Sequence, residues 1–309
     1  MGIVDSLISV FQDAKFTLQE AYDANPLVRK ESVRARLYEN LGTKFERLSR
    51  GVYMAKEGGC ILLEGDGRDL SVIKDSSIDC IITDHPWSDQ SANSGGNRNF
   101  ATYDCFNYTP EDFEEKARVL KPGSFLVEIL PAESESNFRY LYELKEMAIK
   151  AGFRYYCQVP WIKGTFVSNT GRNSKNSEAL MVFSLGTPRK LRLDVKRTNA
   201  LGEETFMSGT RGMLPTDFNV QAVPIKERIC QSEKPHELFE QLLEYITLEN
   251  EIVLDQFAGS GSVGVACLNK NRRCILIEKA KEQVKKIAER IGMEQCVSAG
   301  TPTWRRCMI

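Results

Sequence analysis

The sequence lacks the features that would indicate a disulfide framework, a structural zinc site or a membrane span. Its nine cysteines are an odd number and no two form a CxxC pair, which argues against the first two and fits a reducing cytoplasm. No apolar run approaches the roughly 20 residues that cross a bilayer. The first residues, MGIVDSLISVFQDAKF, also lack the basic start and cleavage site of a signal peptide. We therefore expect a cytoplasmic protein that does not bind a membrane.

A strong net charge is also absent. The chain has a net charge of −1, so it has no global attraction to nucleic acid, and any basic surface must be local. With 309 residues, 42% of them hydrophobic, it has room for one large α/β domain with an insertion or for two modest domains. We find no internal repeat and no low-complexity segment.

The hydrophobic pattern of the chain changes near residue 58. Residues 1–57 are predicted to form a helical N-terminal extension, and Asn25-Pro26 is suited to begin a helix there. From Cys60 onward, short apolar runs such as CILLEGD and SIDCIITD alternate with helical patterns. Such runs, bounded by turns, are typical of buried parallel strands. SEALMVFSLG, at 177–186, is predicted to be a strand of a hairpin.

A glycine turn follows one of the late strands. GSGSVG (259–264) fits the GxGxxG pattern, and Glu278 ends the next strand, nineteen residues after Gly259. Asp255 stands at the end of the preceding strand, where its carboxylate would repel a pyrophosphate but could meet an ammonium group. S-adenosylmethionine has an ammonium, a sulfonium, a ribose diol and no phosphate. Asp255 and Glu278 therefore favour this cofactor over NAD, although the pattern alone is also compatible with an ordinary glycine turn.

A second strand ends in Asp84-His85-Pro86-Trp87. An exocyclic amino group is a poor nucleophile because its lone pair is delocalised into the ring. Two acceptors that grip its hydrogens would orient it and stabilise the developing positive charge. Asp84 offers a carboxylate, residue 85 a carbonyl and Trp87 an aromatic face for an extruded base. The other interpretation is a strand-end turn with a packed tryptophan.

Together these motifs resemble those of amino-group DNA methyltransferases. DQFAGSG (255–261) resembles the cofactor motif, and DHPW resembles (D/N/S)PP(Y/F/W), with His85 in place of the first proline. GDGRDL, RVLKPGSFLVEI, SEALMVFSLG and KPHELFEQLL stand around them in an order similar to that of the permuted β-class of the N6-adenine/N4-cytosine family. The resemblance covers about residues 60–291, apart from the variable segment 187–230.

The resemblance implies a Rossmann-like α/β fold with a mostly parallel sheet and an antiparallel strand. It implies a catalytic half at 58–186, a target-recognition insertion at 187–230 and a cofactor half at 231–291, with 292–309 left as a loose tail. The implied activity is methyl transfer from S-adenosylmethionine to N6 of adenine in double-stranded DNA, because an aspartate at the first motif position is typical of adenine enzymes.

The resemblance also assigns site residues. The catalytic residues would be Asp84, His85, Pro86 and Trp87. His85 would act through its carbonyl or, alternatively, as a donor to the base. Asp66 would approach the cofactor adenine, Lys234 and Asp255 the methionine end, and Glu278 the ribose. The motif adds Phe257, Gly259, Ser260 and Gly261 to the cofactor site.

A basic segment lies between the two motifs. From residue 161 to 198 there are eight basic and two acidic residues, a local net charge of +6 on a chain of net −1. Beside a base-modifying site, contact with DNA phosphates is the favoured interpretation, and a solvated surface is the alternative. The predicted DNA contacts are Lys163, Arg172, Lys175, Arg189, Lys190, Arg192, Lys196 and Arg197.

Several alternatives stay open at this point. They are cytosine N4 methylation, an RNA substrate, a nicotinamide oxidoreductase, and a DNA-binding protein in which His85 has abolished transfer. The sequence gives neither the recognition site nor the role of the N-terminal segment. It also leaves open a restriction endonuclease partner and a homodimer.

Overall fold

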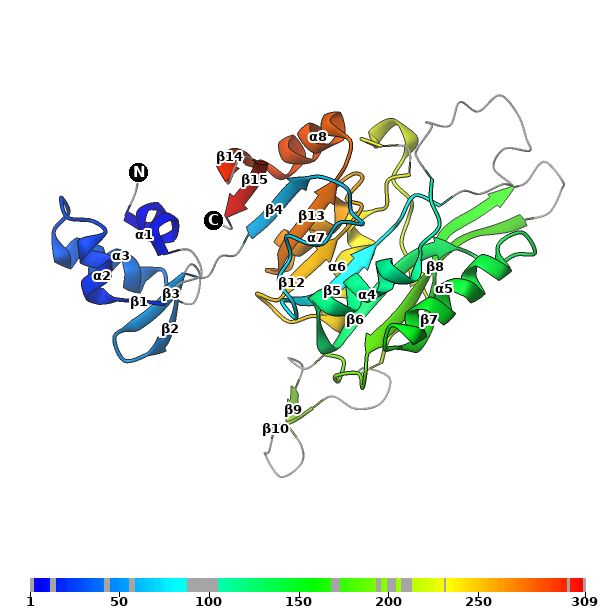
Figure 1. Cartoon of the computed structure of the whole chain (residues 1–309), viewed down its shortest axis with the longest axis horizontal. Helices are drawn as coiled ribbons and strands as arrows, with labels where there is room; N and C mark the ends of the chain where they lie inside the picture. The colour runs from blue at the N-terminus through cyan, green and yellow to red at the C-terminus, as the bar shows by residue number, and fades with distance from the viewer. Residues whose placement is uncertain are drawn as a thin grey trace. The chain divides into compact units, whose positions relative to one another are not determined.

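The computed structural model describes most of the chain, which divides into two compact units, Met1–Gly59 with Cys307–Ile309 and Cys60–Arg306. Figure 1 shows the whole chain. The described residues are 3–11, 15–41, 45–55, 59–87, 105–167, 173–192, 196–198, 204–206, 213–230, 232–298 and 301–307. Within these ranges, no helix combines the length and apolarity that a membrane crossing needs.

The N-terminal unit mixes helices with a small sheet. Its elements are α1 (Ile3–Phe11), β1 (Lys15–Thr17), α2 (Leu18–Asp23), α3 (Lys30–Glu39), β2 (Phe45–Ser49) and β3 (Val52–Ala55). The strands form an antiparallel sheet in the order β1-β3-β2. The prediction of a helical extension is therefore wrong for residues 15–17 and 45–55. Gly51 turns the chain at φ +79°, and Phe45 and Tyr53 become buried on the two strands that it joins.

The larger unit is built on a ten-stranded sheet in the order β11-β7-β8-β6-β5-β12-β13-β4-β15-β14. Its strands are β4 (Gly59–Glu64), β5 (Ile78–Thr83), β6 (Leu120–Pro131), β7 (Phe153–Val167), β8 (Asn173–Leu185), β11 (Phe218–Asn219), β12 (Ile252–Asp255), β13 (Arg273–Glu278), β14 (Glu294–Ser298) and β15 (Thr301–Cys307). The pairs from β6 through β5, β12 and β13 to β4 are all parallel. β8 runs antiparallel to both β6 and β7. The predicted α/β fold is confirmed.

Helices cover both faces of this sheet (Figure 1). α4 (Pro110–Val119) and α5 (Phe138–Lys150) pack on one face, where Ile81 and Leu144 belong to one hydrophobic cluster. α6 (His236–Ile246), α7 (Ser262–Asn269) and α8 (Lys281–Ile291) pack on the other, where Ile82 joins Leu242. Successive residues of β5 thus enter opposite cores, and every residue of the strand is buried. This is why the strand reads as a continuous apolar run.

The structure also describes strands in the segments 292–309 and 187–230. Residues 292–309 were expected to be a loose tail, but β14 and β15 pair antiparallel at the edge of the sheet. The apolar pattern there is too short to predict a strand without its partner. Within 187–230 the structure describes the short antiparallel pair β9 (Lys196–Thr198) and β10 (Glu204–Phe206), then β11 and a 3₁₀ turn at Ile225–Glu227.

Candidate active site

The two predicted motifs lie at the same edge of the sheet. β5 and β12 are parallel neighbours with Ile81 opposite Leu254, so both strands end at this edge. Asp84 follows β5 directly and Asp255 is the last residue of β12. β13 lies on the other side of β12 and ends at Glu278. Three carboxylates from distant parts of the sequence therefore meet at the carboxyl ends of adjacent strands.

Asp84 is held by a buried lysine. The Nζ of Lys234, just before α6, donates a hydrogen bond to Oδ2 of Asp84 and lies 3.5 Å from Oε2 of Glu178. Burial raises the pKa of Asp84, and the ammonium of Lys234 opposes this rise. Burial by itself would lower the pKa of Lys234, but the carboxylates of Asp84 and Glu178 outweigh it, and the pKa lies above its usual range. Lys234 is therefore a fixed cation at the end of the DHPW motif.

Glu178 extends this arrangement to a second lysine. Because β8 is antiparallel to β6, its first residues lie at the carboxyl edge, with Glu178 opposite Pro131. Its Oε1 accepts a hydrogen bond from Lys163 of β7. Burial raises the pKa of Glu178, but Lys234 and Lys163 more than compensate and hold it below its usual value. The charges alternate from Lys163 through Glu178 and Lys234 to Asp84.

The glycine turn is joined to the same group of residues. Gly259 and Gly261 have φ values of +53° and +74°, a region that glycine enters without strain. A Cβ on Gly261 would also lie 2.8 Å from Cγ2 of Ile287. The hydroxyl of Ser262 donates to the carbonyl of Lys234 at 2.6 Å. The turn and the lysine that holds Asp84 are thus one hydrogen bond apart.

The carboxylates beside this turn are unusual acids. The pKa of Asp255 is raised to about 8, mainly by burial. The hydrogen bond from the N–H of Phe257 opposes the rise, and the charges of Asp84 and Glu278 add to it. Burial also raises the pKa of Glu278, whose Oε2 accepts the N–H of Gly259 at 2.9 Å. Such a cluster disfavours an anion and favours a cation. Shifts of this kind are common at functional sites.

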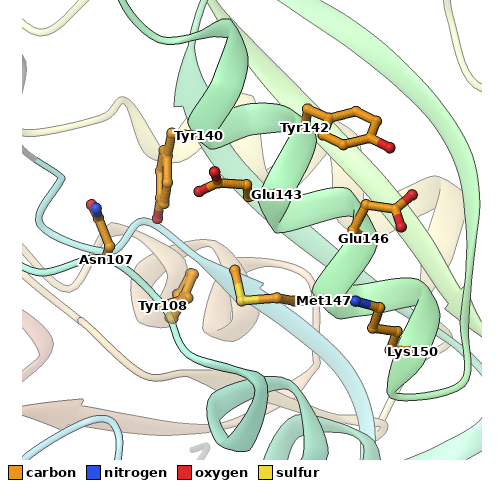
Figure 2. A pocket seen from close by; sticks show the side chains of 8 residues that line it. All are labelled: Asn107, Tyr108, Tyr140, Tyr142, Glu143, Glu146, Met147 and Lys150. Atoms are coloured by element: carbon orange, nitrogen blue, oxygen red, sulfur yellow. The ribbon is translucent and has the colours of Figure 1, made fainter.

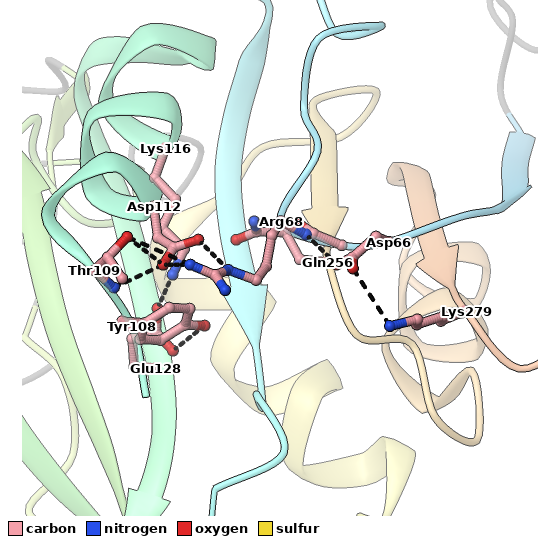
Figure 3. Close-up of polar contacts among 10 residues, drawn as sticks. Asp66, Arg68, Tyr108, Thr109, Asp112, Lys116, Glu128, Gln256 and Lys279 are labelled. Atoms are coloured by element: carbon pink, nitrogen blue, oxygen red, sulfur yellow. Dashed lines mark hydrogen bonds and ion pairs between the residues drawn. The ribbon is translucent and has the colours of Figure 1, made fainter. Parts of the chain in front are cut away.

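The GDG turn (65–67) follows β4 and packs against the residue after β12. A Cβ on Gly67 would lie 1.9 Å from the carbonyl oxygen of Gln256, and the Gln256 amide donates to the carbonyl of Gly67 at 2.7 Å. Asp66 is exposed and lies 3.5 Å from Lys279. Arg68 reaches away from the turn to Asp112 of α4 (Figure 3).

The residues of the DHPW motif differ in exposure. Pro86 and Trp87 are half-buried, and the side chain of Asp84 is 23% exposed. The side chain of His85 is fully buried. Its ring is therefore not placed to contact a base, and its carbonyl is the group left for that role. The carbonyl of Pro86 accepts the N–H of Phe106 at 3.1 Å.

A cavity of about 440 Å³ opens beside the buried histidine. Tyr140, Tyr142, Glu143 and Glu146 of α5 line one side, and Tyr108 lines the other (Figure 2). Tyr140 and Tyr108 are also the tyrosines that contact the ring of His85. The cavity thus adjoins the DHPW motif through these two tyrosines.

The predicted DNA contacts lie in different places. Lys163 is at the carboxyl edge, as described above. Arg189 and Arg192 are at the opposite edge, where Arg189 pairs with Glu251 before β12 and Arg192 stacks on Tyr245. The structure therefore does not support these two as contacts beside Asp84. Lys190 is exposed. Arg172 lies outside the described residues, and the side chains of Lys175, Lys196 and Arg197 are not described.

Sequence reasoning missed three residues of this site. Glu178 had been counted only as an acidic residue, although a charged residue at the start of the otherwise apolar SEALMVFSLG was a usable signal. Gln256 stood unnoticed inside the DQFAGSG motif. Phe106 packs 5.4 Å from the ring of Phe257, and no local pattern indicates this contact.

Comparisons with known proteins agree with this fold. Residues 78–290 match the family model described as DNA methylase, of the N6/N4 type. The match spans well over half of the chain, so the chain belongs to this DNA methylase family. The permuted N6/N4 resemblance found in the sequence leads to the same family.

Individual relatives are more distant. A type II methyltransferase, M.HpaI from Haemophilus parainfluenzae, is 26% identical over 233 residues, which are 73% of this chain and 71% of the relative. The solved M1.HpyAVI–SAM complex is 19% identical with a TM-score of 0.54, and the match covers 75% of this chain and 98% of that one. PvuII DNA methyltransferase, described as cytosine-N4-specific, is 17% identical with a TM-score of 0.53, covering 77% and 87%. These two structures support the fold.

Proposed function

We propose that the chain transfers a methyl group from S-adenosylmethionine to the exocyclic N6 amino group of adenine in double-stranded DNA, with the base flipped out of the helix. One observation carries the proposal: Asp84 and the glycine turn after Asp255 lie side by side at the carboxyl ends of β5 and β12. Ligands of open α/β sheets bind outside these ends.

The edge suits S-adenosylmethionine better than a dinucleotide. Asp255 and Glu278 are carboxylates whose ionised forms are disfavoured by burial, and a cationic ligand would relieve this cost. A pyrophosphate would increase it. Among the described residues, Gln256 has a buried side-chain oxygen, Oε1, without a hydrogen-bond partner, which is a free acceptor at the same edge. When bound, S-adenosylmethionine supplies the electrophilic methyl group.

The chain's own part in the reaction is to hold the target amino group. Asp84 and the carbonyl of His85 would accept its two hydrogens, direct the nitrogen lone pair toward the methyl donor and stabilise the positive charge that develops there. Trp87, which is half-buried, would stack on the extruded base. The ionised form of Asp84 is the better acceptor, because a protonated carboxyl offers fewer acceptor sites.

Lys234 takes a role different from the one first expected. Its ammonium contacts Asp84 and Glu178, which supports a part in keeping Asp84 ionised and correctly oriented. We propose Asp255 as the partner of the cofactor ammonium, because the ammonium of Lys234 would repel it.

The main alternative is cytosine N4 as the target. The relative PvuII is described as cytosine-N4-specific, and both amino groups present the same chemistry to Asp84. Asp84 favours adenine on the family pattern, where serine is commoner for cytosine. M.HpaI is a type II methyltransferase, so a restriction endonuclease that shares the recognition site is a further proposal for this chain.

Three measurements test the proposal. Sequencing with modified-base detection on DNA from cells that express the chain should reveal N6-methyladenine at one short sequence, and mass spectrometry of digested nucleosides should exclude N4-methylcytosine. Calorimetry should detect binding of S-adenosylmethionine and no binding of NAD. Asp84→Ala is the matched control, because it removes the side-chain acceptor and should keep cofactor binding and lose methyl transfer. Tight DNA binding without transfer by the unaltered chain would instead support a catalytically silent protein.

A further inference from the structure

The chain departs from its family motif at His85, and the structure gives this residue a specific set of contacts. Proline at this position would fix its own φ and would disfavour α geometry at the preceding aspartate. Histidine imposes neither restriction. Another source of rigidity is therefore needed if Asp84 is to stay in place.

The ring of His85 is fully buried and touches three side chains. Its Nε2 is 2.5 Å from the hydroxyl of Tyr140 on α5. Its centroid is 4.2 Å from the ring of Tyr108. Its Nδ1 lies 3.8 Å from Oε2 of Glu128 on β6. The ring is thus held between Tyr140 of α5 and Glu128 of β6, on the face of the sheet that α4 and α5 cover.

Glu128 is itself held firmly. Lys116 of α4 donates to Oε1 of Glu128 at 2.7 Å, and the hydroxyl of Tyr108 donates to Oε2 at 3.2 Å (Figure 3). The ammonium of Lys116 also lies 3.4 Å from the centroid of the Tyr108 ring. All of these side chains are buried. A buried network whose charges are paired and hydrogen-bonded is rigid.

The hydroxyl of Tyr140 and Nε2 of His85 share a hydrogen bond. Burial and the charge of Glu128 raise the pKa of Tyr140 above its usual range, so its hydroxyl keeps its proton and can donate to Nε2. In the tautomer that accepts this bond, Nδ1 carries the ring proton on the side of Glu128. Among the described residues, Nε2 is bonded to Tyr140 and Nδ1 has no hydrogen-bond partner, and the ring is fully buried, so neither nitrogen is open to a substrate.

We propose that His85 is a positioning residue whose buried ring, held by Tyr140, Tyr108 and Glu128, fixes the main chain between Asp84 and Pro86 in place of the family's proline. This inference rests on the proposed methyl transfer. It explains how the motif keeps its geometry without the covalent restriction. It also makes Tyr140, which is 55 residues away in the chain, part of the support for Asp84.

The test compares four single variants and one double variant of the full chain for kcat, KM for DNA, affinity for S-adenosylmethionine, and thermal unfolding. His85→Ala should lower kcat by roughly ten- to a hundredfold, because misplacement of a catalytic group is costly, with little change in cofactor affinity. His85→Pro should restore most of the lost rate. Tyr140→Phe should lower kcat in the unaltered chain but have no further effect in the His85→Pro background.

The fourth single variant, Tyr142→Phe, is the matched control, since Tyr142 lies on the same helix with an exposed side chain. It should leave kcat unchanged. Added imidazole gives a second readout, because it can replace a missing proton donor but cannot restrain a main chain. It should not rescue His85→Ala.

Three results would overturn the inference: rescue of His85→Ala by imidazole, a His85→Pro variant as slow as His85→Ala, or equal effects of Tyr140→Phe in both backgrounds. If His85→Ala does not fold, the effect of Tyr140→Phe in the unaltered chain, compared with its effect in the His85→Pro background, still tests the inference. Failure of the unaltered chain to transfer methyl groups would count against the proposed function instead, so the two failures are distinguishable.

Discussion

The ammonium of Lys234 bonds the carboxylate of Asp84, although the two residues stand 150 positions apart in the chain. The contact joins the segments 58–186 and 231–291, which were predicted to be the catalytic and cofactor halves. Among the described residues, the Lys234 ammonium is the only lysine or arginine cation within hydrogen-bond distance of Asp84.

Removing this ammonium should change the pH dependence of methyl transfer. In Lys234→Met, burial would act on Asp84 without its opposing charge, and the pKa of Asp84 would rise further. The less active protonated form would then persist to higher pH, so the acid limb of kcat/KM should move to higher pH, and kcat should fall about a hundredfold. A pH series of methyl incorporation measures both effects. Lys270→Met, which removes an ion pair with Glu244 far from the site, should leave the acid limb in place.

Cofactor binding should release a proton from Asp255. Its pKa of about 8 means that the carboxyl is protonated at neutral pH in the free protein, whereas a bound ammonium favours the ionised form. Affinity should therefore rise with pH up to about 8, by at most tenfold per unit. The cofactor's own amino group titrates nearby, so the difference between the unaltered chain and Asp255→Asn gives the protein's part. Calorimetry in buffers of different ionisation enthalpy measures it. Equal proton release by both proteins would contradict this assignment.

The same residue should make folding stability depend on pH. A carboxyl whose pKa is raised from 3.8 to about 8 in the folded protein binds more protons in the folded state than in the unfolded state between these values. The free energy of unfolding should thus decrease as pH rises from about 4 to 8 through this residue. Asp255→Asn should flatten that part of the profile in urea unfolding. A steeper decline in the variant would contradict the prediction.

Two glycines of the GDG turn provide a matched pair. Gly67→Ala should disturb the turn, because its Cβ would meet the carbonyl of Gln256 at 1.9 Å, whereas nothing lies within 4 Å of a Cβ on Gly65. Overpacking of this kind costs about 1–3 kcal/mol. We expect Gly67→Ala to lose stability and cofactor affinity and Gly65→Ala to lose little of either. Urea unfolding and calorimetry check this, and similar losses in both variants would show that the close approach is unimportant.

Arg189 should matter for stability and not for DNA binding. Its guanidinium makes hydrogen bonds to Glu251 and to the carbonyl of Ile246, at the edge opposite Asp84. Arg189→Met should cost about 1–3 kcal/mol and leave the salt dependence of DNA affinity unchanged. Lys163→Met should reduce the slope of log K against log salt by about 1 if Lys163 meets a phosphate. Fluorescence anisotropy at several salt concentrations separates the two.

The central part of the fold could be predicted from sequence because its signals are local. Mostly apolar runs mark β5 and β12, and an aspartate stands at the carboxyl end of each, directly after β5 and as the last residue of β12. Their adjacency followed only from the family order. The β2–β3 hairpin of the N-terminal unit was missed because FERLSRGVYMA carries helix formers beside a single glycine, and tertiary burial of Phe45 and Tyr53 outweighs that propensity.

The supporting residues of the site could not be predicted for a different reason. Glu178, Glu128 and Tyr140 come from separate strands and a helix, and their importance arises only from three-dimensional contacts. His85 was visible as a departure from the motif, but nothing in the sequence shows that its ring is buried between two tyrosines. Local patterns report strand ends and turns, whereas ion pairs between distant segments need the folded sheet.

The place of β12 in the sheet also affects how the protein must fold during synthesis. β12 lies between β5 and β13, yet about 170 residues are made after β5 before β12 emerges. Until then β5 has an unpaired edge on an apolar strand, which is a template for association with other chains. The nascent chain therefore carries an aggregation-prone edge through most of its translation, and closing that edge is the same event that brings Asp255 to Asp84.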